Sequence, residues 1–206
     1  DWYYCTGDPD AEKFRGCNVN DESAGIWTRL ILDGPNRDLD KLSQLINGVI
    51  AAAKERVYLM TPYFLPTFDL IGTLISAHLR GVKIIILLPG NNNIKIADWA
   101  SRNSVRQLLE SGLDIRYQPP PFVHSKLLLV DDEYALIGSP NIDPRSLRLN
   151  YELGVEVFSC SFNESLRQYF ERRAEISEPI TLSRLRERSL LVRLRDSLAW
   201  LFSPYL

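Results

Sequence analysis

The sequence has few cysteines and few histidines, which excludes several classes of protein. Three cysteines, Cys5, Cys17 and Cys160, and two histidines occur among 206 residues. Because the cysteines are few and scattered, they cannot form a disulfide framework, and a reducing setting is favoured. No Cys-x-x-Cys pair is present, and two histidines do not offer the ligand spacing of a zinc site.

Long apolar runs and an excess of charge are also missing. The apolar strip from Ile84 to Leu88 has the length of a core strand, far short of the roughly 18 residues that a membrane-spanning helix needs. The 24 basic residues nearly balance 26 acidic ones, and the pI is about 5.8. This balance argues against a protein that coats nucleic acid through its overall charge. With 45% hydrophobic residues, the chain is instead expected to fold as a globular domain.

The beginning of the chain predicts that it is a piece of a longer polypeptide. It opens with Asp1-Trp2-Tyr3-Tyr4, its only methionine is Met60, and no apolar leader is visible. Three glycines and one proline interrupt the first 25 positions, where six acidic residues outnumber two basic ones. We interpret residues 1–25 as a lead-in or linker from a missing N-terminal half.

Strips of strand length alternate with amphipathic helical stretches over residues 26–180. Helices are predicted at residues 39–54, 69–80, 96–110 and 162–176, and strands at residues 26–32, 57–60, 82–88, 114–117, 126–130, 134–137 and 153–158. This alternation predicts one α/β domain, a layered mixed β-sheet flanked by helices on both faces. Residues 181–206 differ, because five arginines and several leucines at helical spacing indicate a basic amphipathic C-terminal tail.

The segment from residue 124 to residue 141 carries the chemistry. His124 and Lys126 are two positions apart, so on an extended chain their side chains point to the same face. Gly138, Ser139 and Asn141 follow the predicted returning strand. An imidazole, an ammonium, a hydroxyl and an amide at one strand end suit phosphoryl transfer, because they offer a nucleophile and donors for the phosphate oxygens.

Chance does not explain the whole set, although it could explain single members. Six fixed residues arise by chance in about one window in 10⁸. Asp131, which follows the first strand, could belong to the site or could serve only as a turn former and strand cap. Both the functional and the structural role stay open at this point.

These residues resemble the motif of the phospholipase D superfamily, His-x-Lys-x4-Asp-x6-Gly-Ser-x-Asn, at every position. The resemblance implies a covalent phosphohistidine mechanism that needs no metal or other cofactor. It also implies that Lys126, Ser139 and Asn141 bind the substrate phosphate. Glu152 matches the family carboxylate that hydrogen bonds the motif histidine and stabilises its charged form. The expected catalytic residues are therefore His124, Lys126, Asp131 and Glu152.

The implied mechanism needs two histidines, and His78 does not fit a motif. It lies on a predicted helix without a lysine two positions later. The second motif is therefore expected from a missing N-terminal half or from a homodimer mate, and the fragment alone is expected to be inactive. In the first case His124 belongs to the C-terminal motif, which favours a role as general acid and base over that of nucleophile.

Within the superfamily, the chain resembles the C-terminal half of bacterial cardiolipin synthases. The resemblance rests on residues 61–66, 80–90 and 141–150, with Pro140 as a small departure where alanine is commoner. It implies transfer of a phosphatidyl group from one phosphatidylglycerol to another with release of glycerol. It also implies an anionic membrane surface as partner, and a peripheral location at the cytoplasmic face of the bacterial plasma membrane.

Two other functions compete with this interpretation. A phosphodiesterase or nuclease of the same superfamily would use water as acceptor, although no basic groove studded with aromatic residues is visible in the sequence. A catalytically silent scaffold would not need the intact motif. The role of the tail is also open, because its apolar face could bind a membrane or pack on protein.

Overall fold

The computed structural model describes residues 26–35 and 39–201. The predicted lead-in, residues 1–25, and the last five residues of the predicted tail lie outside the described residues. No helix in the described part of the chain is long and apolar enough to cross a bilayer.

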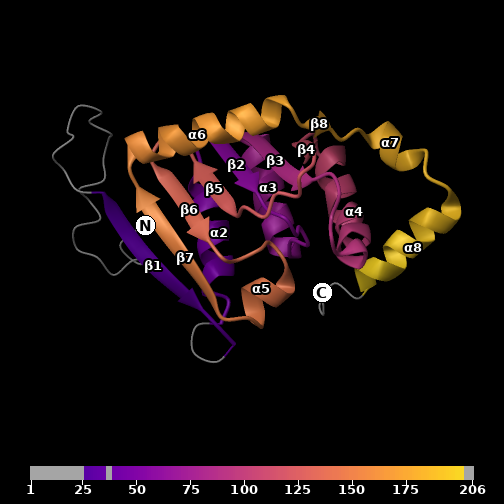
Figure 1. Cartoon of the computed structure of the whole chain (residues 1–206), viewed down its shortest axis with the longest axis horizontal. Coiled ribbons are helices and arrows are strands. Elements are labelled where there is room, and N and C mark those ends of the chain that lie inside the picture. The colour runs from indigo at the N-terminus through magenta and orange to yellow at the C-terminus, as the bar shows by residue number, and fades with distance from the viewer. Residues whose placement is uncertain (1–25, 36–38, 202–206) are drawn as a thin grey trace.

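One mixed sheet runs through the molecule (Figure 1). Its eight strands lie in the order β1-β7-β6-β5-β2-β3-β4-β8. β2, β3 and β4 are parallel, and every other neighbouring pair is antiparallel. The strands are β1 (Trp27–Asp33), β2 (Arg56–Met60), β3 (Lys83–Pro89), β4 (Asp114–Gln118), β5 (Leu127–Val130), β6 (Tyr134–Gly138), β7 (Glu152–Phe158) and β8 (Glu178–Pro179).

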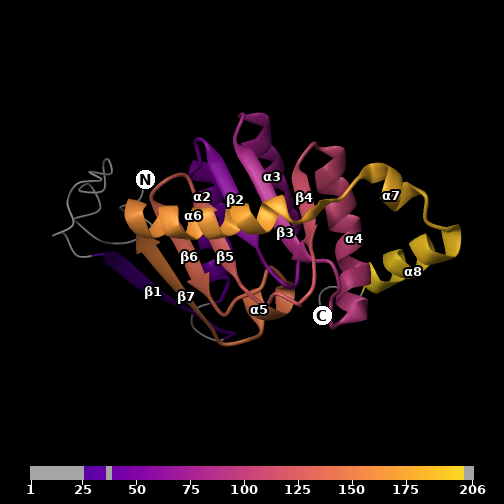
Figure 2. The same ribbon diagram turned by 45° about the horizontal axis from the view of Figure 1, so that its top comes forward.

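Helices cover both faces of this sheet (Figures 1 and 2). α2 (Lys41–Ala52), α3 (Phe68–Leu79) and α4 (Lys95–Glu110) pack on one face, and α6 (Cys160–Glu175) crosses the other. The short α5 (Pro144–Arg148) lies between β6 and β7, and α7 (Leu182–Arg186) and α8 (Leu190–Leu201) follow β8. The predicted layered α/β fold is confirmed.

Successive side chains of the buried strands point to opposite faces of the sheet. They form two hydrophobic cores, one on each side of it. In β3, Ile84, Ile86 and Leu88 face α2, α3 and α4, whereas Ile85 and Leu87 face α6. A strand that is buried on both faces reads as a continuous apolar run, as the sequence of β3 does. Burial on both faces fixes the register of these strands, because a slip of one residue would exchange the two cores.

The structure differs from the sequence-based expectations in four places. α5 and β8 were not predicted, since elements of five and two residues carry too little periodicity to detect. Lys126 was placed in a strand, but β5 begins one residue later, at Leu127. Cys160, at the start of α6, is disulfide-bonded.

Candidate active site

Three strand ends meet where the predicted site residues lie. His124 and Lys126 precede the start of β5, Gly138 ends β6, and Glu152 begins β7. β5 and β7 both run antiparallel to β6, with Leu127 opposite Ile137 and Gly138 opposite Gly154. The sheet register therefore brings both halves of the motif to the same edge.

The side chains of His124 and Lys126 are in contact. Nζ of Lys126 lies 3.0 Å from Nδ1 and 3.3 Å from Nε2 of His124, and it donates to the His124 carbonyl oxygen at 3.0 Å. Neutral imidazole has one ring nitrogen that can accept a hydrogen bond from this ammonium. The two side chains thus lie on the same face, as predicted. Both residues belong to irregular backbone just before β5.

The surroundings lower the pKa of both groups. Partial burial, and then the positive charge of Lys126, hold the pKa of His124 below its ordinary value. Burial also lowers the pKa of Lys126, against the opposing effect of the nearby carboxylates of Glu152 and Asp143. The shift of His124 favours its neutral form, which can accept a proton as general base chemistry near neutral pH requires.

Two aromatic rings flank the His124 imidazole. The ring of Tyr63 meets it edge-on with centroids 6.1 Å apart, and the ring of Phe122 lies at 5.8 Å with a tilt of 45°. The Tyr63 hydroxyl donates to Asn93 at 2.8 Å, which fixes that ring. These contacts limit the orientations open to the imidazole.

Ser139 and Glu152 form a pair beside Lys126. The Ser139 hydroxyl donates to Oε2 of Glu152 and accepts a hydrogen bond from the Leu153 N–H at 3.0 Å. Asn150 donates to Oε1 of the same carboxylate at 3.3 Å. Among the described residues Glu152 makes no hydrogen bond to His124, and it acts on Lys126 through its charge.

Close packing between β6 and β7 makes this pair possible. A Cβ atom at Gly138 would lie 2.2 Å from the Leu153 carbonyl oxygen, a distance that no side chain tolerates. The Ser139 N–H donates to that oxygen at 3.0 Å. Glycine at position 138 therefore allows the approach that brings Ser139 to Glu152.

Asn141 is held from one side by α5. Its Nδ2 donates to the Ser146 hydroxyl at 3.1 Å, and its Oδ1 is buried without a hydrogen-bond partner among the residues described. Asp143 caps α5 by accepting from the Ser146 N–H at 2.7 Å. Burial, the largest effect, and the charge of Glu152 raise the pKa of the Asp143 carboxyl to about 6, against opposing backbone hydrogen bonds.

A small hollow opens at this edge of the sheet. Thr61, Lys126, Gly138 and Pro140 line it together with apolar residues of β2, β5 and β6. The described residues contain no group of three or more His, Cys, Asp or Glu side chains that could hold a metal ion. Of the predicted site residues, Lys126 and Gly138 line this hollow, whereas His124 and Asn141 do not.

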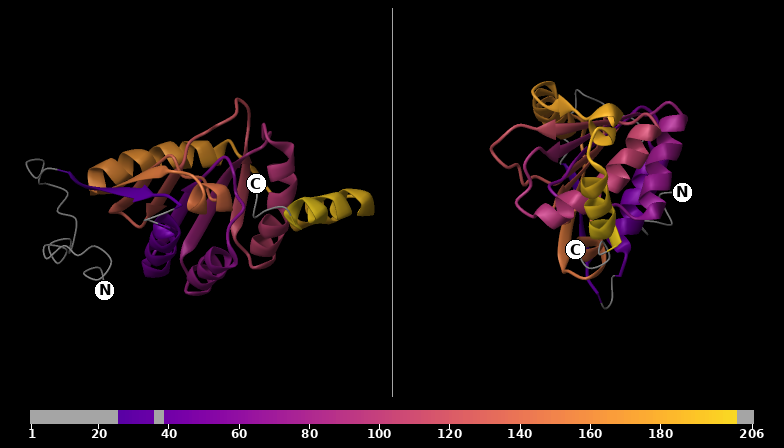
Figure 3. Two further views of the ribbon diagram at one scale, coloured as in Figure 1. Left: turned by 90° about the horizontal axis from the view of Figure 1, so that it is seen from below. Right: turned by 90° about the vertical axis from the view of Figure 1, so that its right-hand side faces the viewer.

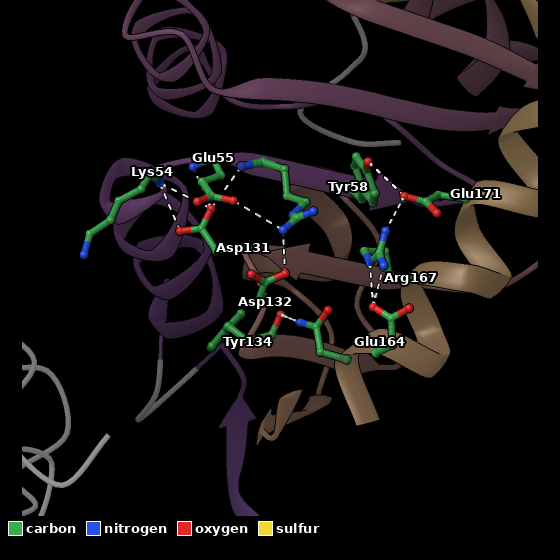
Figure 4. A network of polar contacts seen from close by, with 11 residues as sticks. Lys54, Glu55, Tyr58, Asp131, Asp132, Tyr134, Glu164, Arg167 and Glu171 are labelled. Carbon is green, nitrogen blue, oxygen red and sulfur yellow. Dashed lines mark hydrogen bonds and ion pairs between the residues drawn. The ribbon is translucent and has the colours of Figure 1, made fainter. Parts of the chain in front are cut away.

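Asp131 lies at the opposite end of β5 from His124. Figure 4 shows its carboxylate beside Lys54 and Glu55. Its carboxylate accepts from the backbone N–H groups of Lys54, Glu55 and Arg56, at 2.8 Å for the shortest bond. Its own backbone adopts a φ of 51° in the turn. Of the two roles open from the sequence, this geometry supports the turn and cap, which tie β5 to the start of β2.

His78 also lies away from the cluster. It belongs to the last turn of α3, and its Nε2 is close to Gly112, in the turn before β4. Of the two histidines in the sequence, His124 is therefore the one that lies where the ends of β5, β6 and β7 meet.

Sequence reasoning missed several residues around the site. Tyr63, Ser146 and Asn150 belong to stretches that carried the family resemblance, but the sequence offered no reason to assign a role to any of them. Phe122 follows three prolines and has no periodic pattern around it. Asp143 was recognisable only as a helix cap, by the rule that Asp before Pro starts a helix.

Known proteins share the sequence pattern and the fold of this chain. Residues 46–174 match the family described as "Cardiolipin synthase, PLD-like domain". The chain belongs to this family. It is 31% identical over 186 residues to cardiolipin synthase 2 of Staphylococcus epidermidis, which covers 90% of the chain and 38% of that protein. It is 33% identical over 208 residues to the cardiolipin synthase of Geobacillus thermodenitrificans, which covers 100% of the chain and 41% of that protein.

Two solved structures share the fold. Nuc, a phospholipase D family member from Salmonella typhimurium, aligns with a TM-score of 0.65 and 22% identity over 75% of this chain and 99% of its own. Phosphatidylserine synthase of Haemophilus influenzae aligns with a TM-score of 0.69 and 18% identity over 88% of this chain and 48% of its own. The chain thus spans about two fifths of the length of the curated relatives above.

The position of Asp131 yields a prediction about stability. Asp131→Ala removes the cap of three N–H groups and places alanine at positive φ, so we expect a loss of about 2–4 kcal/mol in the free energy of unfolding. Denaturant unfolding measures it. The adjacent Asp132→Ala is the control, because that side chain is 61% exposed and should cost less than about 1 kcal/mol. Equal losses would contradict the cap role.

The contact between Lys126 and His124 yields a prediction about pH. A neighbouring cation disfavours imidazolium, so Lys126→Gln should raise the pKa of His124 and move its titration midpoint to higher pH. Lys126→Arg keeps the charge and should leave the midpoint closer to that of the wild type. Titration of the histidine NMR signals, assigned with a His78→Gln variant, measures both. A midpoint that stays fixed or falls in Lys126→Gln would refute the coupling.

Proposed function

We propose that the chain supplies one half of the active site of a phosphatidyltransferase of the cardiolipin synthase type. The donor is one phosphatidylglycerol, the acceptor is a second one, and the products are cardiolipin and glycerol. The contact between the His124 imidazole and the Lys126 ammonium, beside the hollow, supports the proposal most strongly. Family membership supports the phospholipid substrate.

Lys126, Ser139 and Asn141 hold the non-bridging phosphate oxygens in this proposal. The ammonium neutralises charge that develops on the phosphoryl group, and the carboxamide adds an oriented donor. The Ser139 hydroxyl turns from Glu152 toward the phosphate when substrate binds. Glu152 then balances the positive charge of Lys126 and the imidazolium form of His124.

We assign His124 as the general acid and base. A histidine of a second motif attacks phosphorus, forming a P–N bond while the P–O bond to the leaving glycerol breaks. Protonated His124 donates its proton to the glycerol oxygen, and its lowered pKa makes it a stronger acid for this step. Neutral His124 then takes the proton from a hydroxyl of the second phosphatidylglycerol, whose oxygen forms the new P–O bond as the P–N bond breaks. Neither step requires a metal.

Only one histidine of this chain, His124, lies at the candidate active site. The second motif therefore has to come from another chain or from another part of a longer protein. A homodimer mate or an N-terminal half of a longer protein could supply it. The alignment lengths of the curated relatives leave room for the second arrangement. We place the assembled enzyme peripherally at the bacterial plasma membrane, where its substrate lies.

Product analysis tests the proposal. The protein with its second motif, given labelled phosphatidylglycerol in the presence of EDTA, should form cardiolipin and glycerol. His124→Asn should lower the rate by about 10²–10⁴-fold, since it removes the acid and base. His78→Asn is the matched control and should retain the rate. Thin-layer chromatography of the lipids measures both.

Other outcomes would lead to different functions. Phosphatidic acid or nucleotides as the only products would favour the hydrolase alternative, with water as acceptor. Full activity of His124→Asn would favour a catalytically silent scaffold. A covalent phosphate on His124 during turnover would make it the nucleophile.

A further inference from the structure

α5 and the turn after it contact two of the predicted site residues. The Ser146 hydroxyl, in α5, accepts a hydrogen bond from Nδ2 of Asn141 at 3.1 Å. Asn150, just after the helix, donates to Glu152 at 3.3 Å. α5 lies at the bottom of Figure 1, and the left view of Figure 3 shows the molecule from that side. The contact of Ser146 is the one that reaches a group assigned to phosphate binding.

The carboxamide of Asn141 uses only part of its hydrogen-bonding capacity. An amide side chain has an acceptor oxygen and two N–H donors. One N–H is bound to Ser146, and the other makes no hydrogen bond within the part of the chain that the structure describes. Oδ1 is buried and likewise has no partner among the described residues. A half turn of the amide would put this oxygen in the place of the nitrogen, where it would repel a phosphate.

The backbone on both sides of this contact is firmly anchored. Ser146 is 1% exposed, and its N–H is bound by the carboxylate of Asp143 at 2.7 Å. Leu147, the next residue, is buried in the core beneath α2 and α3. Ile142, next to Asn141, accepts a backbone hydrogen bond at 2.6 Å from the segment that follows β2. A hydroxyl on such a rigid support can fix the orientation of the side chain that it contacts.

The start of α5 also lies near the ammonium of Lys126. Pro140, which precedes Asn141, lines the hollow together with Lys126. The negative charge of Asp143, which caps α5, reaches the same ammonium and opposes the lowering of its pKa. A phosphate bound by Lys126 is therefore close to the segment that carries the Asn141 carboxamide.

We propose that Ser146 is a positioning residue, whose hydroxyl holds the Asn141 carboxamide with one N–H free to donate to a phosphate oxygen. The inference rests on the phosphate-binding role of Asn141 in the proposed function. Ser146 acts through Asn141 and does not touch the substrate. A donor that is oriented before the reaction needs no rearrangement as charge develops on the phosphoryl group. Loss of the hydroxyl should therefore lower kcat more than it raises KM.

A double-mutant cycle tests the inference in the protein with its second motif. Ser146→Ala should lower kcat at least about tenfold, and Asn141→Ala about 10²–10³-fold. The double variant should match Asn141→Ala within about threefold, because the amide through which Ser146 acts is already absent. Losses that multiply, or a Ser146→Ala enzyme as fast as the wild type, would overturn the inference.

Ser101 provides the matched control for loss of a buried hydroxyl. It is 7% exposed, and its hydroxyl donates to the carbonyl oxygen of Asp98 within α4 at 2.9 Å. Ser101→Ala and Ser146→Ala should lower the denaturation midpoint by similar amounts, since each removes one buried hydrogen bond. Only Ser146→Ala should change kcat. An equal loss of kcat in both variants would show that the rate follows stability, against the positioning role.

Hydrogen exchange of the Asn141 side chain gives a readout on the chain alone. NMR signals of this amide are assigned with Asn141→Ala. In the wild type one hydrogen of Nδ2 should be protected from exchange with water, because it is bound to Ser146. Ser146→Ala should abolish this protection, and Ser101→Ala should preserve it. Unchanged protection in Ser146→Ala would contradict the inference.

The same experiments report separately on the proposed function. A wild type that releases phosphatidic acid and forms no cardiolipin would overturn phosphatidyl transfer, and the cycle measured on that hydrolysis would still test Ser146. A wild type that forms neither product would overturn the proposed function altogether. The exchange of the Asn141 amide hydrogen would then decide whether Ser146 holds the carboxamide.

Discussion

The close approach of β7 to the end of β6 is the constraint on which the site depends. Only glycine fits at position 138, where the Leu153 carbonyl oxygen occupies the space of a Cβ atom. That approach brings the Ser139 hydroxyl into hydrogen-bond contact with the Glu152 carboxylate. The charge of this carboxylate in turn raises the pKa of Lys126, against the effect of burial. Buried strands on both sides of the hairpin hold the register, so the geometry of the site follows from the packing of the sheet.

The electrostatics of the site follow from the same arrangement. Partial burial and then the contact with the Lys126 cation lower the pKa of the His124 imidazole, and the carboxylates of Glu152 and Asp143 oppose the lowering of the pKa of Lys126 by burial. Such a cluster has donors for a phosphate but only one histidine. The proposed catalysis by two histidines therefore needs a second copy of the cluster to face the first.

Much of the fold and the site centre could be predicted from the sequence, because both rest on local patterns. Apolar periodicity located the long strands and helices, and the spacing of His124 and Lys126 implied a shared face. Contacts between distant segments could not be predicted. The flanking ring of Tyr63 and the partners of Asp131 depend on how β2 packs beside β5. The disulfide of Cys160 and the exposure of the α8 leucines likewise have no signature in local periodicity.

A crystal structure of the chain with orthovanadate, a mimic of the transferring phosphoryl group, tests the central claim most directly. The account predicts vanadate bound at the contact between His124 and Lys126, with oxygens within about 3.2 Å of the His124 imidazole, the Lys126 ammonium and the Asn141 carboxamide. Vanadate bound at another place, or an imidazole and ammonium that have separated, would contradict it.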